Sequence, residues 1–391
     1  MPEFGEAVRA DSSSRLFAME MIRKSIASEN LKIAASVIAI KLLVVFYGIQ
    51  TYLVATDKPI NNIYRVLYIW KRWDAVHYIK IAQDGYAAVG EDRFLLVFYP
   101  LYPLLVAILD FVVRDTVLSA FLISGVASVV LAVVLRELVR LDYAERVADA
   151  AVLFLFIFPT SFVLHIPYTE SLFLALVVSA FFAARKRRWL LAGVLGCLAC
   201  TTRINGLLLF PALLLEVWNE FRETREKNWQ WLYLLLIPIG VSSYLGLNYS
   251  VSGDPFKFLE YQREHWHRSL RLPWYGLMDA FRNMIGRSPA QALMVGFQEL
   301  AFVGLGFAGI IQGLRKLRAS YNVWMITNWL LFVSTSYVLS VTRYTIVLFP
   351  LFIVIALLAV RSRFFSVIAT VWSILFLAFF VSEFVRGHWT F

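Results

Sequence analysis

Residues 117–135 read VLSAFLISGVASVVLAVVL, a run without one charged side chain. A helix rises 1.5 Å per residue, so about 20 apolar residues cross the ~30 Å hydrocarbon core of a bilayer. Similar runs lie at 33–54, 149–166, 229–250, 292–314, 322–340, 344–360 and 364–384. The sequence therefore predicts an all-α, polytopic membrane protein.

The composition of the 391 residues agrees, with 60% hydrophobic and 16% charged residues. Soluble domains carry about 25% charged and roughly 45–50% apolar residues, so this chain lacks the polar residues that cover a soluble surface. Its net charge of +10 comes from short basic clusters between the apolar runs. Such clusters are topology signals, and we expect no nucleic-acid partner.

The basic clusters orient the chain, because Lys and Arg are enriched in cytosolic loops. The clusters at 136–146, 185–188 and 222–227 share the cytosolic side only if 168–184 spans the membrane once and 189–218 crosses it twice. The sequence therefore predicts two additional hairpins of helices whose turns lie outside.

The run at 95–112 contains Pro100 and Pro103, and a crossing there would move the next basic cluster outside. We expect a re-entrant or juxtamembrane helix instead. This parity gives about 11 transmembrane helices, with the N-terminus inside and the C-terminus outside. Residues 1–391 then form a single membrane-embedded unit, which comprises a cytosolic N-terminal segment at 1–32 and external loops at 55–116 and 253–291.

The polar residues that stand out from the apolar background all lie on the external side of this topology. They include Trp73 to Tyr78 in the first loop, Gln262 to Trp266 in the second, and the turns around Glu170, Arg203 and Arg343. Acids, cations and aromatic side chains that meet at one membrane face predict a site for a substrate with a charged head and a lipid tail.

Several of these motifs resemble the PIG-V mannosyltransferase family, whose eukaryotic members add the second mannose of the GPI anchor. The matching motifs are Trp73-Asp74-Ala75-x-His77-Tyr78, Ile81-Ala82-x-x-Gly85-Tyr86, Tyr168-Thr169-Glu170-Ser171-Leu172-Phe173, Thr202-Arg203-x-Asn205-Gly206, Gly253-Asp254-Pro255 and Arg343-Tyr344. The resemblance runs from about residue 33 to the C-terminus, and the chain is more similar to a prokaryotic relative than to the eukaryotic enzyme.

This resemblance implies a GT-C membrane glycosyltransferase with external juxtamembrane helices. It implies transfer of mannose from a polyprenyl- or dolichyl-phosphate-linked donor to a hydroxyl of a lipid-linked or other extracytoplasmic acceptor, in one inverting displacement. The expected partners are this donor, a glycan or glycolipid acceptor and membrane lipids. The expected location is the plasma membrane of a prokaryote with the active site outside, or the ER membrane with a luminal site in a eukaryote.

Asp74 is the expected general base. The acceptor hydroxyl loses its proton as it attacks the anomeric carbon, and a carboxylate within ~3 Å can take that proton. The residues alone equally allow an N-cap, because Asp followed by Ala-Val-His-Tyr-Ile begins a plausible helix. The resemblance favours the catalytic interpretation, since this Asp is the family's catalytic position.

The leaving polyprenyl phosphate needs fixed cations in a poorly hydrated place. Arg203 and Arg343 are expected to bind it, with His77 and Tyr344 beside them. The alternatives are interfacial arginines that extend to the headgroups and a structural histidine.

The expected sugar- and acceptor-binding residues are Glu170, Asn205, Gln262, Trp266 and His165. Glu170 matches the family's Glu position, although an acid at a helix start needs no other purpose. Trp266 equally fits an aromatic belt at the membrane interface.

We expect no metal and no other cofactor, because the sequence has no acidic pair with further ligands in a divalent-metal arrangement. A transporter or flippase of a lipid-linked sugar is the alternative function. Transporters usually need ionisable groups near mid-membrane and internal repeats. Here mid-span charge is nearly absent and no repeat is visible, which favours the enzyme.

Overall fold

The computed structural model describes residues 3–57 and 62–390 of the chain. Among these residues the regular structure is helical, and the β-type pairing consists of an isolated bridge between Leu270 and Thr335. The predicted all-α fold class is therefore confirmed.

The helices are α1 (Glu3–Thr56), α2 (Ile63–Tyr68), α3 (Asp74–Asp84), α4 (Leu101–Val113), α5 (Thr116–Arg140), α6 (Glu145–Ile157), α7 (Glu170–Arg185), α8 (Trp189–Cys200), α9 (Leu209–Thr224), α10 (Leu236–Ser252), α11 (Lys257–Glu264), α12 (Pro273–Gly286), α13 (Pro289–Ala292), α14 (Gln298–Lys316), α15 (Ala319–Val333), α16 (Val341–Tyr344), α17 (Phe349–Arg361) and α18 (Arg363–Arg386). Short 3-10 segments are η1 (Glu91–Val97), η2 (Ser161–Leu164), η3 (Ile204–Leu208), η4 (Trp229–Leu235) and η6 (Thr345–Val347), and η5 (Leu293–Phe297) is a π-type segment.

Local signals in the sequence set several helix ends. Asp115 precedes α5 and accepts a hydrogen bond from the Leu118 amide at 2.8 Å, and Ser362 caps α18 through the Phe365 amide. These side chains satisfy amides that the first helical turn leaves without partners. Gly253 ends α10 with a φ of 76°, a left-handed conformation that glycine adopts without strain.

Within the described part of the chain, six helices are long and apolar enough to cross a bilayer: Ser28–Thr56, Thr116–Arg140, Ile204–Thr224, Trp229–Ser252, Leu293–Lys316 and Arg363–Arg386. Two bent pairs, η1 with α4 and α16–η6 with α17, raise this to eight if each pair is one span. The chain is thus an integral membrane protein, while the figure of about 11 spans stays a prediction. The 111° bend between η1 and α4 agrees with the expectation that 95–112 is no straight span.

Two expected spans are shorter helices than the apolar runs suggested. The run at 149–166 stops being helical at Ile157, because Pro159 disfavours helical backbone in the residue before it. The run at 322–340 stops being helical at Val333, and the next residues pair with the loop after α11 through Arg271 N–Ser334 O and Ser336 N–Ser269 O. Apolar composition predicted burial correctly but not helical backbone.

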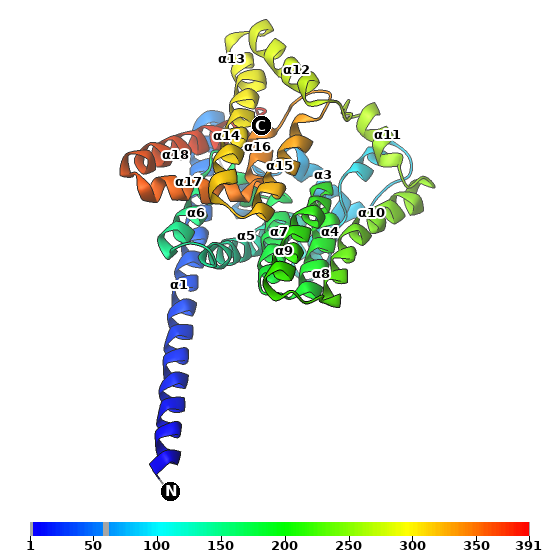
Figure 1. The fold of residues 1–391 in the computed structure, drawn as a ribbon. Coiled ribbons are helices and arrows are strands. Elements are labelled where there is room, and N and C mark those ends of the chain that lie inside the picture. Colours follow the sequence, from blue (N-terminus) through cyan, green and yellow to red (C-terminus); the bar gives the residue numbers. More distant parts are fainter. Residues whose placement is uncertain (1–2, 58–61, 391) are drawn as a thin grey trace.

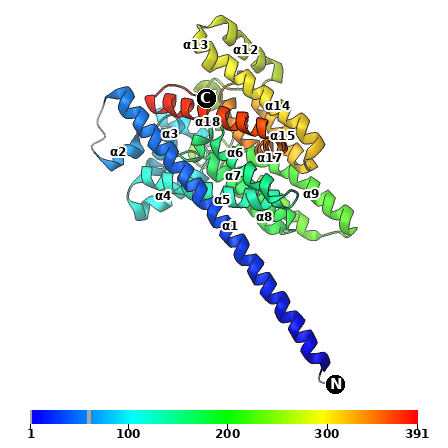
Figure 2. The ribbon, with the colours of Figure 1, turned by 90° about the vertical axis from the view of Figure 1, so that its left-hand side faces the viewer.

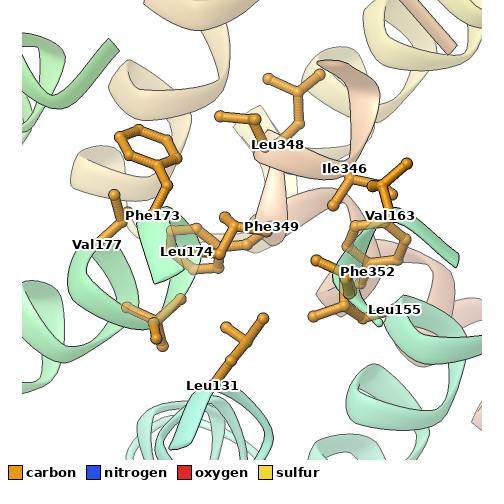
Figure 3. Close-up of a cluster of buried hydrophobic side chains, with 14 of the residues drawn as sticks. Leu131, Leu155, Val163, Phe173, Leu174, Val177, Ile346, Leu348, Phe349 and Phe352 are labelled. Atoms are coloured by element: carbon orange, nitrogen blue, oxygen red, sulfur yellow. The ribbon is translucent and has the colours of Figure 1, made fainter. Parts of the chain in front are cut away.

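The helices form one bundle from which the N-terminal part of α1 projects as a long rod (Figures 1 and 2). Helices α12 and α13 lie at the end of the molecule opposite this rod, and α11 lies at the side, next to α10 (Figure 1). Figure 3 shows the bundle's interior, where Leu131 of α5, Leu155 of α6, Phe173 of α7 and Phe352 of α17 meet in one apolar cluster. Large apolar side chains also cover the outer surface, as lipid contact requires.

Helices α8 and α10 pack closely through small residues. A Cβ at Gly193 would overlap the backbone of Tyr233, just before α10, and a Cβ at Gly240 would overlap the Cys197 carbonyl oxygen. Membrane helices associate without a hydrophobic driving force between them, so small residues that let backbones approach supply much of the packing energy.

We expect Gly240→Ala to destabilise the protein, because its methyl group must displace the backbone of α8. Gly246→Ala in the same helix is the matched control, since nothing lies within 4 Å of a Cβ there. Thermal unfolding in detergent should show a loss of about 1–3 kcal/mol for Gly240→Ala. Gly246→Ala should be neutral or gain up to about 1 kcal/mol from helix propensity. Equal effects of the two substitutions would contradict close α8–α10 packing.

Candidate active site

A cavity of about 640 Å³ opens among the irregular segments that join the helices. Its walls come from the start of α3, the turn before η3, α11 with the loop after it, the end of α15, and α16. Polar lining includes Asp74, Arg203, Gln262, Arg268 and Arg343, while much of the rest is apolar or aromatic. Segments far apart in the sequence therefore contribute to one site.

Asp74 begins α3 and faces this cavity. The preceding residue, Trp73, is the N-cap, has a φ of 51° and packs its ring edge-on against Trp389 at 5.1 Å. Asp74 makes no capping hydrogen bond; its Oδ2 instead accepts a hydrogen bond from Nη1 of Arg343 at 2.6 Å. The N-cap interpretation of Asp74 is therefore wrong, and its side chain remains 28% exposed to the cavity.

Arg343 joins Asp74 to a second carboxylate, that of Glu170. Nε of Arg343 donates to Oε1 of Glu170 at 2.6 Å, and Nη1 of Arg203 donates to the same oxygen at 2.6 Å. Arg203 also donates to Oγ1 of Thr169 at 2.9 Å. Buried ions are tolerated only when they are paired, and the Glu170 side chain is 0% exposed. The result is a chain of alternating charges, Asp74–Arg343–Glu170–Arg203.

Glu299 of α14 holds the segment that carries Arg343. Its two carboxylate oxygens accept the backbone N–H groups of Ser340 at 3.0 Å and Val341 at 2.9 Å. Ser340 has a φ of 67°, so the turn into α16 is sharp. Glu299 is not among the residues predicted from the sequence, although a carboxylate inside the apolar run 292–314 is a signal of a functional residue.

Tyr344 lies between three guanidinium groups. The Cζ atoms of Arg203, Arg268 and Arg343 lie 5.5, 5.4 and 6.0 Å from its ring centre, and Nη1 of Arg268 donates to its hydroxyl at 3.1 Å. Cations near an aromatic face are attracted by the ring quadrupole. Sequence reasoning missed Arg268, because nothing in its loop distinguishes it from the neighbouring arginines before the chain is folded.

The pKa values of Asp74 and His77, both on α3, are shifted by burial and by neighbouring charges. Burial acts to raise the pKa of Asp74, but the Arg343 guanidinium outweighs it and holds that pKa below the ordinary value of 3.8. Burial lowers the pKa of the His77 imidazole even though Asp74 opposes this shift. At pH 7 the pair is therefore an ionised carboxylate beside a neutral imidazole.

The structure brings most of the predicted site residues together. Gln262, Trp266 and Asn205 line the cavity, and Nδ2 of Asn205 donates to Oδ1 of Asn328 at 2.8 Å. His77 lies just behind the lining, where it packs on Phe98 and Trp266 with ring centres 5.0 and 5.6 Å away.

His165 does not reach the site. It lies after η2 in a stretch where residues 158–169 are all buried, and its nearest aromatic contact is Phe156 at 5.7 Å. It does not line the cavity, so its predicted place beside the sugar is wrong. The reason is the early end of α6, which sends this stretch into the protein interior.

The described residues contain no group of three or more His, Cys, Asp or Glu side chains that could hold a metal ion. Each acid at the site is instead bound by a guanidinium or by backbone amides. A reaction that needs no metal remains a prediction.

Part of the chain is similar to known proteins. Residues 99–246 match the model of the dolichyl-phosphate-mannose-protein mannosyltransferase family. GPI mannosyltransferase 2 of Schizosaccharomyces pombe is 29% identical over 153 residues, which are 38% of this chain and 32% of that protein. GPI alpha-1,6-mannosyltransferase 2 of Rattus norvegicus is 32% identical over 147 residues, 35% of this chain and 29% of that protein. The match therefore spans about a third of the length of these curated relatives.

Two solved structures align with most of this chain at TM-scores below 0.5. ArnT from Cupriavidus metallidurans, bound to undecaprenyl phosphate, aligns with 82% of this chain and 60% of its own, at a TM-score of 0.49 and 15% identity. The oligosaccharyltransferase of Archaeoglobus fulgidus aligns with 90% of this chain and 56% of its own, at a TM-score of 0.44 and 10% identity.

The resemblance to the PIG-V mannosyltransferase family is thus confirmed by the similarity to these GPI mannosyltransferases. The matched region contains Glu170, Arg203 and Asn205, and so includes one half of the charge network. Residues 99–246 are therefore similar to the dolichyl-phosphate-mannose-protein mannosyltransferase family, and part of the chain is similar to GPI mannosyltransferase 2.

Proposed function

We propose that this protein transfers mannose from a polyprenyl- or dolichyl-phosphate-linked donor to a hydroxyl of a lipid-linked or other extracytoplasmic acceptor, with inversion at the anomeric carbon. The observation that carries the proposal is the carboxylate of Asp74, ionised, exposed to a cavity and held by Arg343 beside further guanidinium groups. This is the pairing of base and cations that transfer from a lipid phosphate requires.

In the proposed reaction the acceptor oxygen attacks the anomeric carbon and forms the new glycosidic bond. The bond from that carbon to the phosphate oxygen breaks on the opposite side, and its electron pair leaves with the polyprenyl phosphate. The acceptor's proton passes to the Asp74 carboxylate. The guanidinium groups around Tyr344 stabilise the second negative charge that develops on the phosphate.

The shape and composition of the cavity support this assignment. About 640 Å³ accommodates a sugar with part of its lipid, since ligand pockets of drug size occupy roughly 300–1,000 Å³. Gln262 and Asn205 supply amides and Trp266 an aromatic face for sugar hydroxyls and carbons. The family that residues 99–246 match is named after dolichyl-phosphate-mannose, which belongs to the donor class proposed here.

The site belongs, in this proposal, to the extracytoplasmic side. The loops that build it alternate along the chain with the basic clusters that predict the cytosolic side. A prokaryotic plasma membrane with the cavity outside fits this arrangement. The GPI acceptor of the relatives is not assigned to this chain, because the match spans only about a third of their length.

We expect purified protein in detergent to transfer radiolabelled mannose from polyprenyl-phosphate-mannose to extracted membrane lipids. Asp74→Asn should reduce the rate about 10²–10⁴-fold, because the amide cannot accept the proton. Asp84→Asn, an exposed carboxylate at the end of the same helix, is the matched control and should retain the parent rate. Equal transfer by parent and Asp74→Asn would remove Asp74 from this role. Donor movement across vesicles without transfer would favour the alternative, a transporter.

The pH dependence of kcat/KM should reflect the effect of Arg343 on the pKa of Asp74. The pKa of Asp74 lies below its ordinary value, so kcat/KM should stay level as the pH falls from 8 to about 5. Arg343→Gln removes the cation that opposes burial, which raises the pKa of Asp74 and moves the acidic loss of activity to higher pH. Arg343→Lys keeps the charge and should shift it less. If the loss of kcat/KM at acidic pH is unchanged in Arg343→Gln, the protonation of Asp74 does not control the rate.

A further inference from the structure

We propose that Arg268 is the residue that binds the phosphate of the lipid-linked donor, and that Arg203 and Arg343 serve to hold the two carboxylates of the site. This inference rests on the proposed function and changes the residue roles that the sequence predicted. Its basis is the distribution of ion pairs among the three guanidinium groups around Tyr344.

Two of these three cations already have anionic partners. Arg343 bonds to Asp74 and Glu170, and Arg203 bonds to Glu170, so two cations and two carboxylates balance each other. Arg268 has no carboxylate within 4.0 Å among the described residues. Arg268 is therefore the guanidinium of this cluster without a direct ion pair, because the acid that acts on it from further away, Glu299, is bound by the amides of Ser340 and Val341.

Arg268 also has hydrogen-bonding capacity left. A guanidinium carries five N–H donors in a planar fork that matches phosphate oxygens. Within residues 3–57 and 62–390, one of these donors bonds, to the Tyr344 hydroxyl at 3.1 Å. The side chain is half-buried and lines the cavity. A partly desolvated cation without a direct ion pair costs free energy that a bound anion offsets.

The backbone holds Arg268 in place. Its own N–H donates to the Gln262 carbonyl oxygen at 2.9 Å, which ties it to the end of α11. The next residues pair with the segment after α15 through Ser336 N–Ser269 O at 2.8 Å and Arg271 N–Ser334 O at 3.1 Å. A binding group fixed this way loses little conformational entropy when a ligand arrives.

The surroundings of Arg268 suit a lipid phosphate better than a free one. The cavity that Arg268 lines also has apolar lining. It comes from the loop after α11, from α15 and from the segment before α16, and it comprises Leu270, Leu331, Phe332 and Leu339. Leu270 is 72% exposed, so this apolar wall continues to the protein surface. A phosphate at Arg268 can therefore carry an isoprenoid chain that leaves along apolar side chains.

The test measures binding of farnesyl phosphate and of farnesol to the purified full chain by calorimetry. Arg268→Gln should weaken farnesyl phosphate binding at least about tenfold, because it removes a charge-assisted hydrogen bond. Binding of farnesol, which lacks the phosphate, should not change. Arg268→Lys keeps the charge and should recover part of the affinity. Arg271→Gln is the matched control, an exposed arginine three residues on that does not line the cavity.

Kinetics separate this role from a structural one. In the transfer assay Arg268→Gln should raise the donor KM more than it lowers kcat, with a thermal unfolding midpoint like that of Arg271→Gln. Equal farnesyl phosphate affinity in the parent and Arg268→Gln, or no phosphate-dependent binding by the parent, would overturn the proposal. An affinity for inorganic phosphate equal to that for farnesyl phosphate would overturn the lipid part of it.

The failure of this proposal and that of the proposed function remain distinguishable. Arg268-dependent binding without mannose transfer would leave the phosphate site standing and refute the enzyme. Mannose transfer with phosphate binding that does not depend on Arg268 would leave the enzyme standing and refute this site. Asp74→Asn should still bind farnesyl phosphate, because Asp74 is not among the groups assigned to the phosphate.

Discussion

The ion pairs of Arg343 are the constraint on which the site depends. One guanidinium binds Asp74 at the start of α3 and Glu170 at the start of α7, and so fixes two helices that lie almost a hundred residues apart. The Arg343 side chain is only 3% exposed, so removing one partner would leave an uncompensated charge in a desolvated place. Packing of the apolar helices brings these termini near each other, and the ion pairs select their exact register.

Non-helical backbone inside the bundle needs hydrogen-bond partners for its polar groups. The segments after α6 and α15 leave helical geometry inside the bundle, where lipid offers no hydrogen bonds. Some of their polar atoms find partners in the protein: Thr160 Oγ1 bonds to the Thr342 carbonyl oxygen, and Glu299 accepts the amides that open α16. The cavity therefore forms where helices are interrupted, and neighbouring segments supply hydrogen bonds to the interrupted backbone.

The sequence predicted that the chain is an integral membrane protein and that Asp74, Glu170, Arg203 and Arg343 are site residues. Both predictions depend on features that can be recognised in a short stretch of sequence. Long apolar runs indicate helices, and charges beside them stand out. It could not predict which arginine pairs with which acid, since these pairs join segments that only the folded chain brings together. Arg268 and Glu299 were missed for that reason. The runs at 149–166 and 322–340 were predicted to be helical throughout, but their helices end at Ile157 and Val333. Apolar composition indicates that a segment is buried, but it does not indicate how its backbone is hydrogen-bonded.

Arg343 poses a chemical trade-off that the cluster as a whole can resolve. By lowering the pKa of Asp74 it keeps the carboxylate ionised, but it also makes that carboxylate a weaker base. In the proposed transfer, Asp74 gains the proton and becomes neutral while the phosphate gains a second negative charge, so the total charge of the site does not change. Arg343 then loses one of its two anionic partners, Asp74, at the moment when a new anion forms beside Tyr344. The guanidinium groups can therefore stabilise the ionised base before the reaction and the leaving phosphate after it. Because these cations favour departure of the phosphate, a weak base is sufficient.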